Sequence, residues 1–184
     1  SVVSLRAAVT YGPGDMRSSI AGRLLCAAAY KHLGEGMRFL WDGELAVATV
    51  HAADVAAAAW HVATLASPAP VYNLADSGCT TQRSIGLAIT ALCGLRVSFA
   101  GSLASNAVKL KLGGLRGFAE IANDKHMEPF SELCAAGGVT STPLTPFQDA
   151  ELLAHNHISV DGRAICATGF SYSRPRLTAE TLCE

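Results

Sequence analysis

The sequence predicts an α/β protein in which a parallel sheet is followed by a mostly helical region. The chain opens on a short apolar strand that ends at the turn Gly12–Gly14. Strand and helix patterns then alternate with short connections as far as Asp76, which is typical of parallel sheets. From Cys79 onward, apolar residues recur mainly at the spacing of amphipathic helices.

Composition narrows the class of protein. With 184 residues, 50% of them hydrophobic and 16% charged, the chain can bury a core and is not a disordered segment. A net charge of −1 gives no electrostatic reason to expect nucleic acid as a partner. No apolar stretch approaches the ~20 residues that a transmembrane span requires. The six cysteines include no Cys-x-x-Cys pair, which favours a reducing, cytoplasmic setting over a disulfide framework or zinc site.

The opening strand, residues 2–9, is apolar on both faces, so it is predicted to be a buried interior strand. The glycines of the turn Gly12–Gly14 can adopt positive φ and the proline between them fixes its own, so the chain leaves the sheet there. Ligands of open α/β sheets bind beyond the carboxyl ends of the strands. Two interpretations stay open: the turn, with Thr10 and Tyr11, faces a ligand crevice, or a buried strand is followed by an ordinary turn.

The next elements are predicted from periodicity and turn signals. A helix is expected over residues 16–33, with Asp15 or Ser18 as its cap. Two apolar segments, residues 37–41 and 45–51, flank the Asp-Gly turn at residues 42–43 and predict a β-hairpin.

An alanine-rich helix and further short elements are expected downstream. Helices are predicted over residues 54–65, 80–92, 103–121 (kinked or split at the Gly-Gly pair at 113–114), 130–136, 149–154 and 179–183, and strands over residues 71–74, 97–100 and 158–160.

Common catalytic motifs are missing from the sequence. There is no Gly-x-Ser-x-Gly nucleophile turn, no His-Glu-x-x-His metal motif and no Walker or Gly-x-Gly-x-x-Gly phosphate loop. No catalytic or metal-binding residue is therefore assigned. His51 stands out because it ends a predicted strand three residues before Asp54 at a helix start. Two interpretations stay open: His51 faces the crevice, or it hydrogen-bonds the loop.

Three blocks in order resemble one family. Residues 5–15 (Leu-Arg-Ala-Ala-Val-Thr-Tyr-Gly-Pro-Gly-Asp), 50–56 (Val-His-Ala-Ala-Asp-Val-Ala) and 71–76 (Val-Tyr-Asn-Leu-Ala-Asp) are similar to successive blocks of the extended short-chain dehydrogenase/reductases, the NAD-dependent epimerase/dehydratase group. Residues 168–175 (Thr-Gly-Phe-Ser-Tyr-Ser-Arg-Pro) resemble the closing segment of that family. The resemblance covers only the C-terminal half of the family's pattern and implies a Rossmann-like parallel sheet.

The family's N-terminal signatures do not occur here. Members carry a Gly-x-x-Gly-x-x-Gly loop and a Tyr-x-x-x-Lys pair upstream of the first block, whereas no tyrosine of this chain has a lysine four residues later. The resemblance therefore implies a truncated chain or gene model whose partner is the missing N-terminal half of the same fold.

Site residues follow from the resemblance by position. The residues expected to bind NAD or NADP in the intact protein are those beside the nicotinamide end of the cofactor: Arg6, Ala7, Ala8 and Val9. The residues expected to bind substrate enter the turn or end the later strand: Thr10, Tyr11, Gly12, Pro13 and His51.

The expected substrate class rests on two positions at which this chain differs from nucleotide-sugar members of the family. Nucleotide-sugar members of the family often have Asn where this chain has Val9 and Arg where it has Val47. Both polar groups would serve a sugar diphosphate, so their replacement favours a less charged hydroxyl or carbonyl substrate. Sugar nucleotides, sterol-like compounds and other small molecules stay open.

The resemblance implies a division of the chain and a function. Residues 1–76 would be the last strands and crossover helix of the Rossmann sheet, with an inserted lobe segment at about residues 16–50. Residues 77–184 would form a mostly helical substrate lobe. The expected function is that of the C-terminal fragment of an NAD(P)-dependent oxidoreductase or epimerase. The alternative is a non-catalytic binding or scaffold protein derived from the same fold. The oligomeric state is left open, with a homodimer as the candidate.

Overall fold

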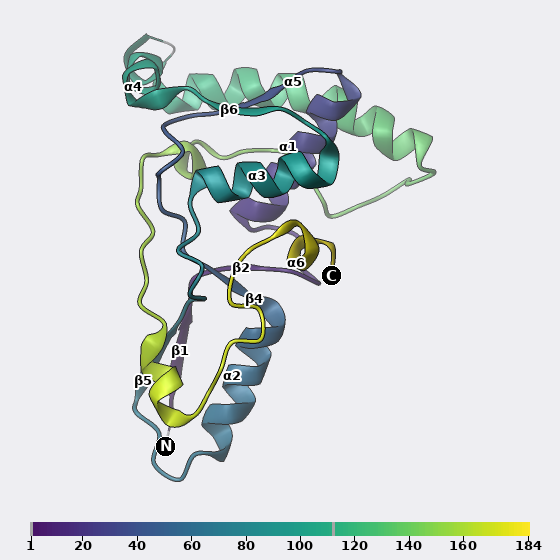
Figure 1. Ribbon diagram of the computed structural model, residues 1–184. Helices are drawn as coiled ribbons and strands as arrows, with labels where there is room; N and C mark the ends of the chain where they lie inside the picture. Colours follow the sequence, from purple (N-terminus) through teal and green to yellow (C-terminus); the bar gives the residue numbers. More distant parts are fainter. Residues whose placement is uncertain (1, 112) are drawn as a thin grey trace.

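The computed structural model describes residues 2–111 and 113–184 (Figure 1). It is a mixed α/β structure in which three parallel strand pairs are combined with helices. In chain order the elements are β1 (Ser4–Ala7), β2 (Val9–Tyr11), α1 (Ser19–His32), β3 (Met37–Phe39), β4 (Thr49–His51), α2 (Ala52–Thr64), β5 (Val71–Leu74), α3 (Gln82–Cys93), β6 (Val97–Phe99), α4 (Gly101–Lys111), α5 (Gly114–Ala136), the 3-10 helices η1 (Ala150–Leu153) and η2 (Arg163–Thr168), and α6 (Ala179–Cys183).

The opening strand changes partner along its length. β1 pairs in parallel with β5, and β2 pairs in parallel with β4. The Ala8 amide donates to Leu74 O at 2.8 Å, whereas the next amide, that of Val9, donates to Ala48 O at 3.1 Å. Because successive strand amides point to opposite edges, β5 and β4 lie on opposite sides of this strand. The predicted parallel arrangement is therefore confirmed.

One edge of β1 has no partner strand among the described residues. Ser4, Arg6 and Ala7 are exposed and Leu5 is half-buried, so the prediction of a fully buried interior strand is wrong for β1 in this structure. A strand is buried only when neighbours cover both its edges and both its faces. Here β5 covers one edge only.

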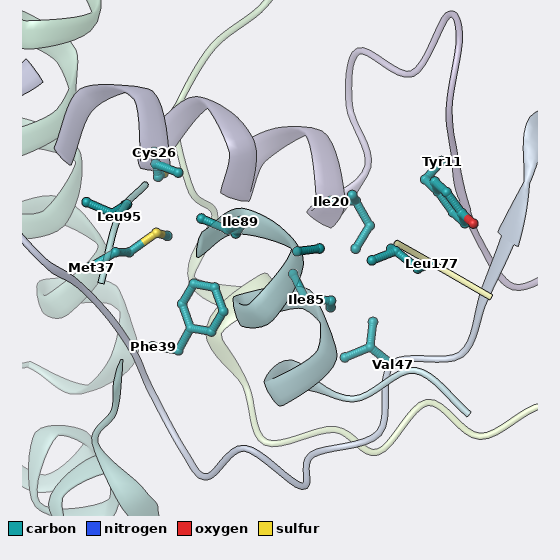
Figure 2. Packing of buried hydrophobic residues seen from close by; sticks show 12 residues of the cluster. Tyr11, Ile20, Cys26, Met37, Phe39, Val47, Ile85, Ile89, Leu95 and Leu177 are labelled. Atoms are coloured by element: carbon teal, nitrogen blue, oxygen red, sulfur yellow. The ribbon is translucent and has the colours of Figure 1, made fainter. Parts of the chain in front are cut away.

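The predicted hairpin across residues 42–43 is also wrong. β3 pairs in parallel with β6, about sixty residues further along the chain, and β4 pairs with β2. The loop between β3 and β4 instead binds the start of α3: the Arg83 amide donates to Gly43 O at 2.8 Å, and Gln82 Nε2 donates to Asp42 O at 3.0 Å. The side chains of Met37 and Phe39 pack beside α3 in the core, so tertiary packing overrides the local turn signal (Figure 2).

Most helices begin and end where local signals predict. Ser18 caps α1 by accepting from the amides of Ile20 and Ala21, and Thr81 caps α3, which ends at Gly94 with φ 65°. The predicted break at the Gly-Gly pair is present, because α4 ends before it and α5 begins at Gly114. Residues 130–136, predicted as a separate element, continue α5 past Pro129.

Three hydrophobic clusters hold the described elements together. The largest joins α1, α3 and β3 with Leu177, which lies near the C-terminus (Figure 2). The second lies between β5, α2 and η2. The third packs Leu40, Trp41 and Leu45 against α4, α5 and η1. Figure 1 shows the strand pairs β1–β5 and β2–β4 with α2 on one side of the molecule and α1, α3, α4 and α5 on the other. We call the second group, with β3 and β6, the helical lobe. Among the described residues, no helix has the length and apolar character that crossing a bilayer demands.

Candidate functional site

The ends of β2 and β4 bring Tyr11 and His51 together. Both side chains are fully buried, and their rings meet edge to face with centroids 5.2 Å apart. The parallel register pairs these two residues directly. Two of the residues predicted to bind substrate are therefore neighbours at the carboxyl ends of parallel strands, where ligands of such sheets bind.

The two ring nitrogens of His51 have different surroundings. Its Nδ1 accepts from the Ala53 amide at 3.2 Å, so the side chain caps α2. Its Nε2 is buried without a hydrogen-bond partner, and a carboxylate oxygen, Glu184 Oε2, lies at 3.8 Å. One nitrogen therefore holds the start of α2, and the other carries no hydrogen bond within the described residues.

Gly12 lies against the free nitrogen of His51. A Cβ at position 12 would stand 2.5 Å from His51 Nε2, and the backbone has φ 111°, a region that other residues rarely adopt. Glycine is required here for close approach as well as for the turn. The sequence signalled only the turn.

A buried carboxylate fixes the C-terminal segment over the strand ends. Asp54, 1% exposed, accepts hydrogen bonds from the Ser173 amide at 2.8 Å, the Ser173 hydroxyl at 2.6 Å and the Arg174 amide at 2.9 Å. Two blocks of the family resemblance are thus joined in space. The sequence presented Asp54 only as a helix-start residue, and no local signal shows this long-range contact.

A second polar chain lies beside this site and was missed by sequence reasoning. Thr80 donates to Thr49, and Thr49 donates to Asp76 Oδ2, each at 2.8 Å. Burial raises the pKa of Asp76 above its usual range, against the lowering effect of its hydrogen bonds with Thr49 and Gly78. These residues line a cavity of about 120 Å³ with Ile158.

The other predicted site residues lie along the strand rather than converging with His51. Arg6 and Ala7 are exposed at the open edge of β1, and Ala8 and Val9 are half-buried. The Thr10 hydroxyl donates to the carbonyl of Ala8 at 3.3 Å, so it faces its own backbone.

The last predicted site residues are those of the turn. Gly12 is half-buried and Pro13 is exposed. No group of three or more metal-ligating side chains occurs within residues 2–111 and 113–184.

Comparison with known proteins identifies the fold. No protein-family model and no curated protein matches the sequence. The crystal structure of human epimerase family protein SDR39U1 (isoform 2) with NADPH matches with a TM-score of 0.58 and 19% identity, covering 99% of this chain and 48% of that chain. Helicobacter pylori ADP-L-glycero-D-manno-heptose-6-epimerase gives a TM-score of 0.44 at 23% identity, covering 53% of this chain and 32% of that one.

The chain spans about half the length of the human structure that it matches. It has the fold of part of that epimerase-family structure, which confirms the predicted fold class: strands and helices of a Rossmann-like parallel sheet combined with a helical lobe.

Proposed function

We propose that this chain is the C-terminal part of an NAD(P)-dependent oxidoreductase or epimerase of the extended short-chain dehydrogenase/reductase family. The open edge of β1 carries the proposal. A parallel strand that has a partner on one edge only, and that leads into the buried Tyr11 and His51, is the arrangement expected where the first half of a Rossmann sheet would continue.

The backbone and the surface beside β1 fit a missing half-sheet. The amides of Ser4 and Ala8 bond the β5 side, so by strand alternation those of Leu5 and Ala7 point to the open edge. A groove of about 390 Å³ beside this strand is lined by apolar residues of β1 and α2, among them Leu5 and Val62. A strand with its covering helix would use both features. We propose that the partner is a polypeptide segment carrying a glycine-rich loop and a Tyr-x-x-x-Lys pair.

The residues Arg6 to Val9 fit the nicotinamide end of a dinucleotide. The side chains of Ala7 and Ala8 are small, so a planar ring can approach the backbone, and no described carboxylate is paired with Arg6. NAD or NADP, when bound, supplies the hydride acceptor or donor. In this proposal Arg6, Ala7, Ala8 and Val9 position that ring by backbone contact.

The substrate-facing residues would hold a hydroxyl or carbonyl group. Burial raises the pKa of Tyr11, so its phenol stays protonated, and it donates to Thr181 Oγ1 at 3.4 Å. His51 Nε2 has no protein partner and is the free polar atom at the strand ends. Thr10, Gly12 and Pro13 would shape the entrance. The proton-transfer groups themselves belong to the missing Tyr-x-x-x-Lys pair.

Cofactor titration tests the proposal. NADH and NADPH are titrated against the purified protein alone and together with a polypeptide carrying the missing half, with hydride transfer followed in the mixture. We expect no tight binding by the chain alone, and binding with turnover in the mixture. Submicromolar binding by the chain alone would contradict an incomplete cofactor site. A mixture that associates but neither binds cofactor nor turns over would favour the non-catalytic scaffold.

A further inference from the structure

A cavity of about 90 Å³ lies inside the helical lobe, between α1, β3 and α5. Its walls are largely apolar, and none of its lining residues belongs to β1, β2 or β4. Among its polar lining residues, Arg23 of α1 and His126 of α5 each carry a buried side-chain nitrogen without a hydrogen-bond partner. No Asp or Glu side chain lines it.

Arg23 brings an uncompensated positive charge to this cavity. Its Nη1 is buried without a hydrogen-bond partner, and no ion pair among the described residues includes it. Its guanidinium contacts the face of the Phe39 ring, 5.5 Å from the centroid. Burial lowers the pKa of Arg23 to about 10. The side chain as a whole is half-buried, but Nη1 is enclosed without an acceptor. Burying a charged donor is costly unless an anion or another acceptor accompanies it, so the protein alone leaves Nη1 unsatisfied.

His126 supplies a second unsatisfied atom on the facing helix. The residue is 5% exposed, and its Nε2 is buried without a partner. Its Nδ1 lies 3.5 Å from Cys26 Sγ. Burial, and secondarily the neighbouring Lys125, lower the pKa of His126, so the ring is neutral near pH 7.

The neighbouring cysteine does not make this a nucleophile site. Burial raises the pKa of Cys26 to about 12, and its thiol donates to the carbonyl of Pro146 at 3.2 Å. Since a thiolate, not a thiol, is the reactive form, the Cys26–His126 contact is structural. The arrangement therefore points to binding rather than covalent chemistry.

The backbone beside the cavity is held in a conformation that non-glycine residues rarely adopt. Trp41 lines the cavity with φ 67° and is 3% exposed. Two hydrogen bonds maintain it: its amide donates to Ser105 Oγ at 2.7 Å and its indole Nε1 donates to Leu153 O at 2.8 Å. Such strain, over-determined by its surroundings, is typical of ligand sites.

We propose that this cavity binds a small organic acid, with its carboxylate between Arg23 and His126 and its hydrocarbon part against Trp41 and Phe118. A carboxylate satisfies both atoms, because the guanidinium donates to it and His126 donates from Nε2 once the ring takes up a proton together with the acid. A cavity of about 150 Å³ accommodates benzene. Benzene has six non-hydrogen atoms, so the space of about 90 Å³ here suits an acid of about four, which is the size of acetate. The inference is independent of the oxidoreductase proposal, because it uses other residues and needs no cofactor.

Acetate and acetamide are matched probes for this site. They have nearly the same shape, and only acetate carries the negative charge that would pair with Arg23. Each is titrated against the purified protein while the ring signals of His126 are followed by NMR. We expect a saturable shift with acetate, a rise in the pKa of His126 in its complex, and binding of acetamide weaker by about 10-fold or more.

Variants separate this site from non-specific anion binding. Arg23→Met keeps an unbranched apolar chain in the cavity and should weaken acetate about 10-fold or more while leaving acetamide nearly unchanged. Lys31→Met removes an exposed charge from the same helix, outside the cavity, and should change neither. Equal affinities for the two probes, an Arg23→Met variant that binds acetate as well as the parent protein, or His126 signals that do not respond to acetate would each overturn the proposal.

Discussion

The strand-end region and the helical lobe are incomplete in different ways. At the strand ends, the polar side chains are largely satisfied by the protein, as the three hydrogen bonds to Asp54 show, but a strand edge is left open. In the helical lobe, the backbone packing is closed around a core, but two buried polar atoms have no partner. In our proposals, the first region would be completed by a further polypeptide segment and the second by a small ligand.

An open strand edge and an unpaired cation require different partners. An open strand edge presents alternating amides and carbonyls, which another strand satisfies best. A buried guanidinium demands an anion. Substitutions at the strand ends should therefore destabilise the protein, whereas removal of the orphaned cation from the lobe should stabilise it.

The largest effect is expected for Asp54→Ala. The substitution removes the carboxylate acceptor of three hydrogen bonds from Ser173 and Arg174, which should lower the free energy of unfolding by about 3 kcal/mol. Urea denaturation measures the loss. Asp161→Ala is the control, because that carboxylate is exposed and bonded only to nearby Arg163. A loss of stability as large in the control would show that the hydrogen bonds from Ser173 and Arg174 to Asp54 are not the cause.

Gly12→Ala should lower the free energy of unfolding by about 2 kcal/mol, because strain at positive φ is combined with a clash against His51. The matched control is Gly34→Ala, which also has positive φ, at 67°, but meets nothing within 4 Å. Its loss should be about 1 kcal/mol. Thermal unfolding of both variants checks the difference, and equal losses would show that position 12 is not crowded by His51.

Arg23→Met tests whether removing a charge from the helical lobe stabilises the protein. Without added acid, replacing the guanidinium, whose buried Nη1 has no partner, should raise the free energy of unfolding by about 1 kcal/mol. Chemical denaturation of the variant and of Lys31→Met gives the comparison. A loss of stability in Arg23→Met alone would mean that the protein itself already satisfies this cation.

The smallest effect is the pH dependence due to His126. Its pKa is lowered in the folded state from an ordinary 6.5, so the unfolded state binds the proton more readily and stability falls as pH decreases below about 6.5. The fall ends once pH passes below the folded-state pKa. The groups that face this ring are Arg23, Cys26, Tyr30 and Lys125. Denaturation between pH 7 and about 5 should show a flatter profile for His126→Gln; an unchanged profile would assign the dependence to other groups.

Local signals were sufficient for most helix boundaries and for part of the site. Ser18, Thr81 and Gly94 act on backbone groups a few residues away, so their capping roles can be predicted from the adjacent sequence. The turn at Gly12 and the end of the strand at His51 are local in the same sense. That they meet was not predicted, because it follows from the parallel pairing of β2 with β4.

The order of most strands, turns and helix caps could be predicted from the sequence, since these depend on hydrogen bonds and backbone preferences within a few residues. The tertiary structure alone decided which strands pair, that β1 keeps an exposed edge, that Asp54 bonds Ser173, and that Arg23 and His126 share a cavity. These contacts join residues up to 119 positions apart, as between Asp54 and Ser173, and their free energy depends on burial that no local pattern records.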